Sequence, residues 1–167
     1  QVRALIVAID LSPERLATAR EFGATDGVLA GPGAAARVRE LTGGRGLDHV
    51  FVATGAPAAF ACAPALLAAG GSLVVVGLPP SGVTVPFEPT TLAAINQAIL
   101  GSRMGASVLA RDIPWLIDQW RLGRLKLAEL ISARYPLADI NAAIAATKSG
   151  AARRNVIVFD EGGAVPS

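Results

Sequence analysis

The sequence alternates short, continuous apolar runs with segments that carry helix signals, and this alternation constrains the fold more than any other feature. The clearest apolar runs are residues 4–9 (ALIVAI), 49–54 (HVFVAT) and 72–78 (SLVVVGL). A strand that is apolar at successive positions is buried on both faces, which is typical of a parallel sheet covered by helices on each side. We therefore expect an α/β protein built on a doubly wound parallel sheet.

Helix signals fill the intervals between the apolar runs. Ser12 and Pro13 form an N-cap residue followed by a proline at the first helical position, and Gly23 supplies a stop. Pro64 lies inside the alanine-rich helix that opens at Pro57, and it should kink that helix. The other expected elements are strands at residues 27–30, 98–101, 130–133 and 155–159, and helices at 34–41, at 91–96, from 112 to a stop at 123, and around 140–144 with a stop at 150.

Composition and charge exclude several classes of protein. Hydrophobic residues make up 52% of the 167 residues, charged residues make up 17%, and the formal net charge is +2. Disorder requires few apolar residues and a high net charge, so a folded protein is expected. The arginines are scattered rather than gathered in a stripe, and only 5% of the residues are aromatic, so we expect no nucleic-acid partner.

The stretch from Phe51 to Phe87 carries no charged residue, and its length alone would allow it to span a membrane. Prolines and glycines, however, divide it into pieces, and no cluster of basic residues flanks it. Among them are Pro57, Pro64, Gly70, Gly71, Gly77, Pro79 and Pro80. We expect a buried strand, a covering helix and a second buried strand in place of a membrane span. The first residues show no signal-peptide pattern, and a cytoplasmic protein is expected.

The chain has one cysteine, Cys62, and one histidine, His49. A disulfide framework is therefore impossible, which fits a reducing cytosol. Zinc sites usually need three or four Cys, His or carboxylate ligands, so none is expected from this chain alone. We expect His49 to be a structural strand residue and Cys62 to be a small hydrophobic residue of the core.

Ligands of doubly wound sheets bind outside the carboxyl ends of the strands, so the residues that follow each apolar run are the candidates for a site. Asp10 follows the first run. A carboxylate there either accepts hydrogen bonds from the adenosine ribose of a dinucleotide, which favours NAD over NADP, or is a solvated turn residue. Gly55 and Gly77 end two other strands, where glycine either admits a ligand close to the backbone or serves the turn.

A glycine-rich string, residues 31–36 (GPGAAA), matches a dinucleotide-binding fingerprint but lacks its acidic partner. The next strand ends Ala53-Thr54-Gly55, without an acid, and Asp10 precedes the string. We interpret the string as a coincidental match. A ribose-binding Asp10 needs a phosphate loop about 20 residues earlier, more than the sequence before it provides. The expected sheet therefore lacks its first strand and its glycine-rich loop.

Together these residues resemble the cofactor domain of the zinc-dependent medium-chain alcohol dehydrogenases, and specifically the carboxyl-terminal half of that family. The order and spacing of many modest motifs carry the resemblance, which covers nearly the whole chain. They are residues 10–16, 22–25, 41–51, 54–55, 70–71, 74–78, 112–114, 123–125, 130–131, 137, 140–141 and 154–159.

The resemblance implies a role for each of nine residues toward NAD, and no catalytic or metal-binding residue. Asp10 would bind the adenosine ribose with Arg15 beside it, and Arg154 would contact the pyrophosphate. The other implied contacts are Thr54 and Gly55 along the adenosine and pyrophosphate path, Val76, Gly77 and Leu78 in the nicotinamide pocket, and Leu100 near the nicotinamide side.

The resemblance also implies an organisation and a reaction. Residues 1–101 would be a partial NAD-binding Rossmann domain, residues 102–160 a return segment that packs on an absent catalytic domain, and residues 161–167 a tail. The family transfers hydride between an alcohol and aldehyde pair and NAD, with zinc polarising the alcohol oxygen. The zinc ligands belong to the absent domain, so the chain alone is expected to be inactive, and a homo-oligomer through sheet edges is expected.

Three alternatives remain open at this point. The first is a zinc-free, quinone reductase-like member of the same superfamily, against which Asp10 argues mildly because many such reductases use NADP. The second is a non-catalytic oligomerisation module, because a sheet without its central strand exposes unpaired edges. The third, a methyltransferase, also places an acid after the second strand, but it does not account for the run that contains Arg154.

Overall fold

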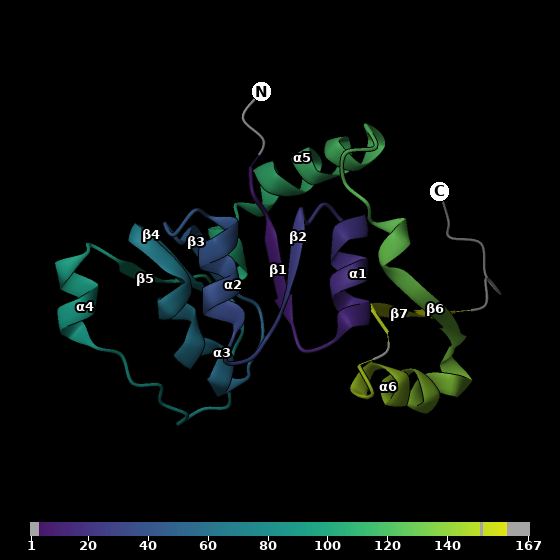
Figure 1. Ribbon diagram of the computed structural model, residues 1–167. Coiled ribbons are helices and arrows are strands. Elements are labelled where there is room, and N and C mark those ends of the chain that lie inside the picture. The colour runs from purple at the N-terminus through teal and green to yellow at the C-terminus, as the bar shows by residue number, and fades with distance from the viewer. Residues whose placement is uncertain (1–3, 151, 160–167) are drawn as a thin grey trace. The chain divides into compact units, whose positions relative to one another are not determined.

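The structure, a computed structural model, describes residues 4–150 and 152–159 (Figure 1). Two compact units make up the chain, unit 1 over Gln1–Ser107 and unit 2 over Val108–Ser167. The tail expected at residues 161–167 lies outside the described residues, as do the first three residues. The expectation that residues 102–160 form a return segment that packs on a catalytic domain stays a prediction.

Unit 1 alternates strands and helices along its whole length, as the sequence predicts. All of its strand pairs are parallel: β1 with β2, β3 with β4, and β4 with β5. The elements are β1 (Val7–Asp10), α1 (Pro13–Glu21), β2 (Asp26–Leu29), α2 (Ala34–Leu41), β3 (Leu47–Val52), α3 (Pro57–Cys62), β4 (Leu67–Val75), α4 (Pro89–Ala94) and β5 (Ala98–Gly101).

The strands of unit 1 form two separate parallel sheets, one of β1 and β2 and the other of β3, β4 and β5. Within the described residues, β1 and β3 are not hydrogen-bonded to each other, so each keeps an unpaired edge. One parallel strand between β1 and β3 would give the strand order of a doubly wound dinucleotide-binding sheet. The predicted fold class, a Rossmann-type sheet that lacks its first strand, is confirmed.

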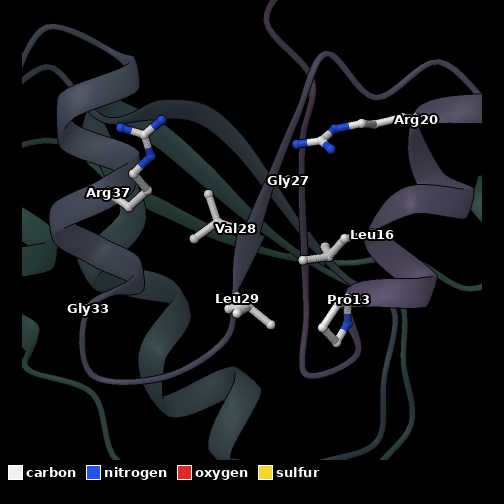
Figure 2. A pocket seen from close by; sticks show the side chains of 8 residues that line it. All are labelled: Pro13, Leu16, Arg20, Gly27, Val28, Leu29, Gly33 and Arg37. Carbon is white, nitrogen blue, oxygen red and sulfur yellow. The ribbon is translucent and has the colours of Figure 1, made fainter.

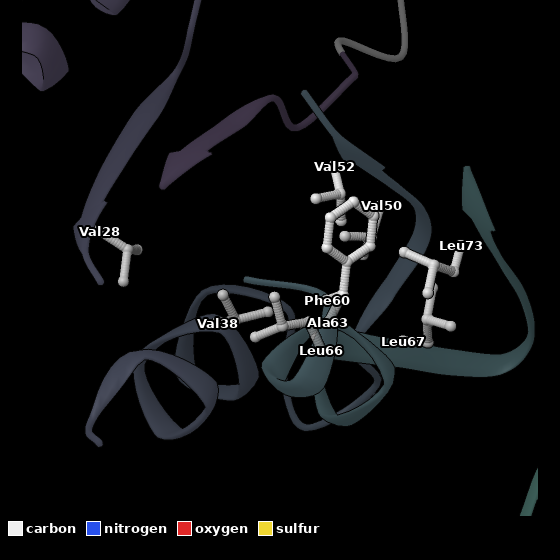
Figure 3. Close-up of a cluster of buried hydrophobic side chains, with 9 residues drawn as sticks. All are labelled: Val28, Val38, Val50, Val52, Phe60, Ala63, Leu66, Leu67 and Leu73. Carbon is white, nitrogen blue, oxygen red and sulfur yellow. The ribbon is translucent and has the colours of Figure 1, made fainter. Parts of the chain in front are cut away.

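A single hydrophobic core joins the two sheets (Figure 3). Val28 of β2 and Val38 of α2 pack in the same cluster as Val50 and Val52 of β3, and Phe60 of α3 completes its centre. Val38 is fully buried. The shared cluster explains how the two sheets stay in one unit without hydrogen bonds between β1 and β3, since burial of apolar surface is not directional.

Local sequence signals account for most helix ends in unit 1. The Ser12 hydroxyl accepts a hydrogen bond from the Arg15 amide at 3.2 Å, the contact that defines an N-cap. Pro64 does not lie inside α3 as predicted, because α3 ends at Cys62 and the chain continues as a 3₁₀ turn over Ala63–Leu66 that contains Pro64. The strand expected from residue 72 was placed too late, since β4 begins at Leu67.

Unit 2 contains one long helix followed by a parallel strand pair. Its elements are α5 (Leu109–Arg121), β6 (Ile131–Pro136), α6 (Ile140–Lys148) and β7 (Arg154–Val158), with β6 and β7 parallel. The predicted start of α5 at Asp112 was wrong by three residues. The Asp112 carboxylate instead accepts a hydrogen bond from the Val108 amide at 2.8 Å, so this side chain caps a turn that has already begun.

Within residues 4–150 and 152–159, the apolar and uncharged stretch resolves into strands and short helices. No helix in this part of the chain is both long enough and apolar enough to cross a membrane.

Candidate functional site

The candidate site of unit 1 is built from the residues that follow β1, β3 and β4. Asp10 is the last residue of β1, where the parallel strand gives way to the turn before α1. Its carboxylate accepts a hydrogen bond from the Ser12 amide at 2.9 Å, and 34% of its side chain is exposed. The backbone turn therefore fixes the carboxylate in place and leaves part of it free to accept further hydrogen bonds.

Arg15 lies one helical turn further on, beside Asp10, as the sequence predicts. Its Nη1 is 3.7 Å from Oδ2 of Asp10, and the two side chains are 57% and 34% exposed. A second acid of the same turn is engaged elsewhere, because the Ser12 hydroxyl donates to Glu14 at 2.6 Å. This hydrogen bond lowers the pKa of Glu14 below its ordinary value.

The turns after β3 and β4 interlock through two glycines. A Cβ at Gly77 would lie 2.1 Å from the Thr54 carbonyl oxygen and 2.6 Å from the Thr54 nitrogen. A Cβ at Gly55 would lie 2.7 Å from the carbonyl oxygen of Leu78. The amides of Val76 and Gly77 both donate to the Val52 carbonyl, at 3.1 and 2.7 Å. Each turn therefore uses a glycine because the backbone of the other occupies the space of a side chain.

The remaining predicted contacts of unit 1 are exposed near these strand ends. Val76 is 42% exposed, Leu78 is 87% exposed, and Leu100, the third residue of β5, is 49% exposed. Thr54 is also exposed, and its hydroxyl accepts a hydrogen bond from the Ala56 amide at 3.2 Å. Large apolar side chains in water at the end of a sheet are available to be covered.

Arg154 is the first residue of β7 and belongs to unit 2, where its side chain is exposed. The nine predicted residues therefore fall into two groups, eight residues in unit 1 and Arg154 in unit 2.

The predictions for the single histidine and the single cysteine of the chain have different outcomes. His49 lies in β3, as expected, on the exposed side of the strand with its ring 6.5 Å from the ring of Phe51. The prediction that Cys62 is a core residue was wrong, because this thiol is exposed. In α3, Phe60 is the buried residue, and Cys62 is the last residue of the helix, before the chain turns into Ala63–Leu66.

Sequence reasoning missed an ion pair at the start of β3. Arg45 contacts both carboxylate oxygens of Asp48, at 2.5 and 2.8 Å. These hydrogen bonds lower the pKa of Asp48 and raise the pKa of Arg45 relative to their ordinary values. The sequence signal for this pair is an arginine and an aspartate that lie three positions apart, at residues 45 and 48.

The described residues suit a dinucleotide better than a metal. Among residues 4–150 and 152–159, no group of three or more His, Cys, Asp and Glu side chains could hold a metal ion. Zinc thus has no fitting donor set in this part of the chain. Asp10, at the carboxyl end of β1, provides a part-exposed acceptor suited to ribose hydroxyls.

The fold and this arrangement define the class: a Rossmann-like α/β unit of the dinucleotide-binding type. Comparison with solved structures agrees. An alcohol dehydrogenase zinc-binding domain protein from Burkholderia ambifaria superposes with a TM-score of 0.87 at 34% identity, over 92% of this chain and 41% of that one. Benzyl alcohol dehydrogenase from Acinetobacter calcoaceticus gives a TM-score of 0.87 at 26% identity, over 93% and 43%.

The family follows from the sequence comparisons. The family model described as zinc-binding dehydrogenase matches residues 2–120, and the chain belongs to this family. A relative named putative alcohol dehydrogenase D, from Mycobacterium tuberculosis, is 33% identical over 156 residues, which are 92% of this chain and 42% of the relative. The NDMA-dependent alcohol dehydrogenase of Amycolatopsis methanolica is 28% identical over 156 residues, which are again 92% of this chain and 42% of the relative. The chain thus spans less than half the length of these relatives.

Proposed function

We propose that this chain is the NAD-binding portion of an alcohol dehydrogenase-like oxidoreductase that transfers hydride between an alcohol and aldehyde pair and NAD. One observation carries the proposal. Asp10 ends β1, is held by the Ser12 amide at 2.9 Å, and keeps 34% of its side chain exposed. A carboxylate at this place in a doubly wound sheet is suited to accept hydrogen bonds from both hydroxyls of the adenosine ribose.

The charge of Asp10 also bears on the choice of cofactor. A 2′-phosphate would bring negative charge against this carboxylate, so NAD is favoured over NADP. Arg15, at 3.7 Å, neutralises only part of that charge, since both side chains are substantially exposed to water. The preference therefore belongs to the turn between β1 and α1.

The other contacts divide the dinucleotide between strand ends. Thr54 and Gly55 would border the path of the adenosine and pyrophosphate, and Val76, Gly77 and Leu78 would line the nicotinamide pocket with Leu100 nearby. Arg154 would hold pyrophosphate oxygens through its planar guanidinium. When bound, NAD supplies the hydride acceptor, and these residues orient it and exclude water.

We further propose that the chain does not oxidise alcohols by itself. The described residues offer no donor set for the zinc that would polarise the alcohol oxygen. Affinity of residues 1–167 for NAD should also be weak, because the nine residues before Asp10 among them contain no glycine-rich loop to present helix amides to the pyrophosphate. Turnover of a simple alcohol with NAD, or a submicromolar dissociation constant for NAD, would contradict these two statements.

The test is a pair of cofactor titrations on the purified protein and two matched variants. Asp10→Asn removes the charge at the carboxyl end of β1, and Asp26→Asn removes one at the beginning of the neighbouring strand β2. Dissociation constants for NADH and NADPH are measured by calorimetry. We expect wild type to prefer NADH, and Asp10→Asn to lose about tenfold in NADH affinity, the value of one hydrogen bond to a charged group.

The control and the two cofactors separate the outcomes. Asp26→Asn should bind NADH as wild type does. Equal affinity of the wild-type protein for NADH and NADPH would favour the zinc-free reductase over the alcohol dehydrogenase. An Asp10→Asn variant with unchanged NADH affinity would refute the ribose contact.

A homo-oligomer through sheet edges, working in the cytoplasm, completes the proposal. β5 pairs only with β4 among the described residues, and Ile99 and Leu100 on it are 41% and 49% exposed. An unpaired apolar edge invites pairing with a second strand. A single cysteine allows no intrachain disulfide, which suits a reducing compartment. Light scattering tests the oligomer, and a monomer at micromolar concentration would contradict it.

A further inference from the structure

An open recess of about 420 Å³ lies at the outer edge of β2 (Figure 2). It has contributions from α1, from β2 and from the start of α2. Among the described residues that line it, two are arginines and none is an acid. The eight lining residues are Pro13, Leu16, Arg20, Gly27, Val28, Leu29, Gly33 and Arg37.

The recess contains backbone that has no strand partner among the described residues. Asp26 and Ala30 donate their amides to the carbonyls of Ile6 and Asp10, toward β1. Backbone groups of a strand alternate between its two edges, so the amides and carbonyls of Gly27 and Leu29 face away from β1. Both of these residues line the recess. The edge therefore offers two donors and two acceptors in the spacing that an added strand requires.

The two arginines reach this edge from opposite faces of the sheet. α1 packs on the face of Gly27, because a Cβ there would lie 3.3 Å from Cβ of Leu16. α2 packs on the other face, where its Val38 shares the core with Val28. Since successive residues of a strand face opposite sides, Arg20 of α1 and Arg37 of α2 flank the edge, one above and one below. Figure 2 shows the Arg20 guanidinium turned toward Gly27, with Arg37 on the α2 side of the strand.

Both guanidinium groups are available to an incoming acid. Arg20 is exposed, its Nη2 would be 3.6 Å from a Cβ at Gly27, and the described residues give it no ion pair. Arg37 contacts Glu40 at 2.8 Å, but these side chains are 55% and 65% exposed. Exposed pairs of this kind contribute little free energy, so a second carboxylate can replace Glu40.

We propose that the outer edge of β2 binds an extended acidic segment of a partner protein, which pairs with Gly27 and Leu29 as an added strand. The side chains of an extended chain point alternately to opposite faces. Two adjacent acidic residues would therefore meet Arg20 on one face and Arg37 on the other. Main-chain hydrogen bonds supply affinity in this mode of recognition, and the alternate side chains supply specificity.

The experiment compares two labelled hexapeptides of identical composition by fluorescence polarisation. One, Thr-Val-Asp-Glu-Val-Thr, places its acids next to each other, and the other, Thr-Asp-Val-Glu-Val-Thr, places both acids on one face. We expect the first peptide to bind about fivefold more tightly, the upper range for one exposed ion pair. Arg20→Gln and Arg37→Gln should each remove this difference, whereas Arg45→Gln, which loses only the pair with Asp48, should keep it.

Amide hydrogen exchange gives a second readout that does not depend on the variants. The first peptide should slow exchange at Gly27 and Leu29. Equal binding of the two peptides would overturn the proposal, as would protection at the unpaired edges of β1 or β3 in place of β2. Inorganic phosphate that displaces the peptide at equal concentration would identify an anion site and not a strand-binding edge.

Discussion

Gly77→Ala is expected to destabilise unit 1 strongly because its methyl group has no space. The added Cβ would lie 2.1 Å from the Thr54 carbonyl oxygen and 2.4 Å from the Thr54 carbonyl carbon. These are backbone atoms, so no rotation of a side chain relieves the contact. The turn after β3 or the turn after β4 must move by about 1 Å, at a cost near the top of the range for overpacking, about 3 kcal/mol.

The size of the effect should follow the contact distances. At Gly55, the added Cβ would be 2.7 Å from the Leu78 carbonyl oxygen, so Gly55→Ala should cost less, about 1–2 kcal/mol. Gly101→Ala is the matched control, because this glycine ends β5 in the same sheet and a Cβ there meets nothing within 4 Å. Its stability should change by less than about 1 kcal/mol.

Urea unfolding followed by far-UV circular dichroism measures these differences. The two tryptophans and the one tyrosine all lie in unit 2, so their fluorescence does not report on unit 1. With a slope of about 2 kcal/mol/M, a loss of 3 kcal/mol lowers the midpoint by about 1.5 M. A Gly77→Ala midpoint equal to that of Gly101→Ala would refute the interlocked turns.

Two further predictions concern unit 2 and α3. Asp112→Ala should lower the urea midpoint of unit 2, followed by tryptophan fluorescence. The hydrogen bonds from Arg111 and from the Val108 amide lower the pKa of Asp112, so its stabilisation is full above about pH 5 and is lost as the pH falls through this lowered pKa. A difference between variant and wild type that persists at pH 2 would contradict this cause. Cys62 should react with one equivalent of a thiol reagent without denaturant, and Cys62→Ala should change stability by less than about 0.5 kcal/mol; a thiol that reacts only in urea would contradict its exposure.

Periodicity and turn chemistry were enough to predict most elements of this fold. The expected helix at residues 34–41 and the expected strand at 98–101 match α2 and β5 residue for residue. These segments are bounded by glycines or by a polar residue whose local preference agrees with the tertiary structure. The early start of β4 at Leu67 was not predictable from glycines 70 and 71, because glycine disfavours a strand by itself and only pairing with β3 extends the strand through them.

The sequence also did not show which side of the short helix α3 is buried. Cys62 has an apolar side chain in an apolar segment, and every local signal favours the core. Which residue of α3 is buried depends on how the helix axis meets β3, and here Phe60 takes that place. The recess beside β2 was not predicted for the same reason. Arg20 and Arg37 belong to two different helices, and the sequence does not show that these helices pack on either side of the same strand.

The interlocked glycines decide which residue can test cofactor binding. On the sequence alone, Gly55 and Gly77 had two explanations, a close approach by a ligand and the needs of the turns. The structure supplies a complete packing reason for both glycines. A Cβ added to either one would lie less than 3 Å from backbone atoms of the other turn. A variant at either glycine would thus lose NAD binding through damage to the fold even if no cofactor ever touched it. Asp10 is a cleaner position to change: its carboxylate is part-exposed, Asn retains the oxygen that accepts from the Ser12 amide, and the exposed pair with Arg15 contributes little to stability. A change in NADH affinity at Asp10 with unchanged stability would therefore reflect the ribose, and this is why Asp10 is the position on which the proposed function depends.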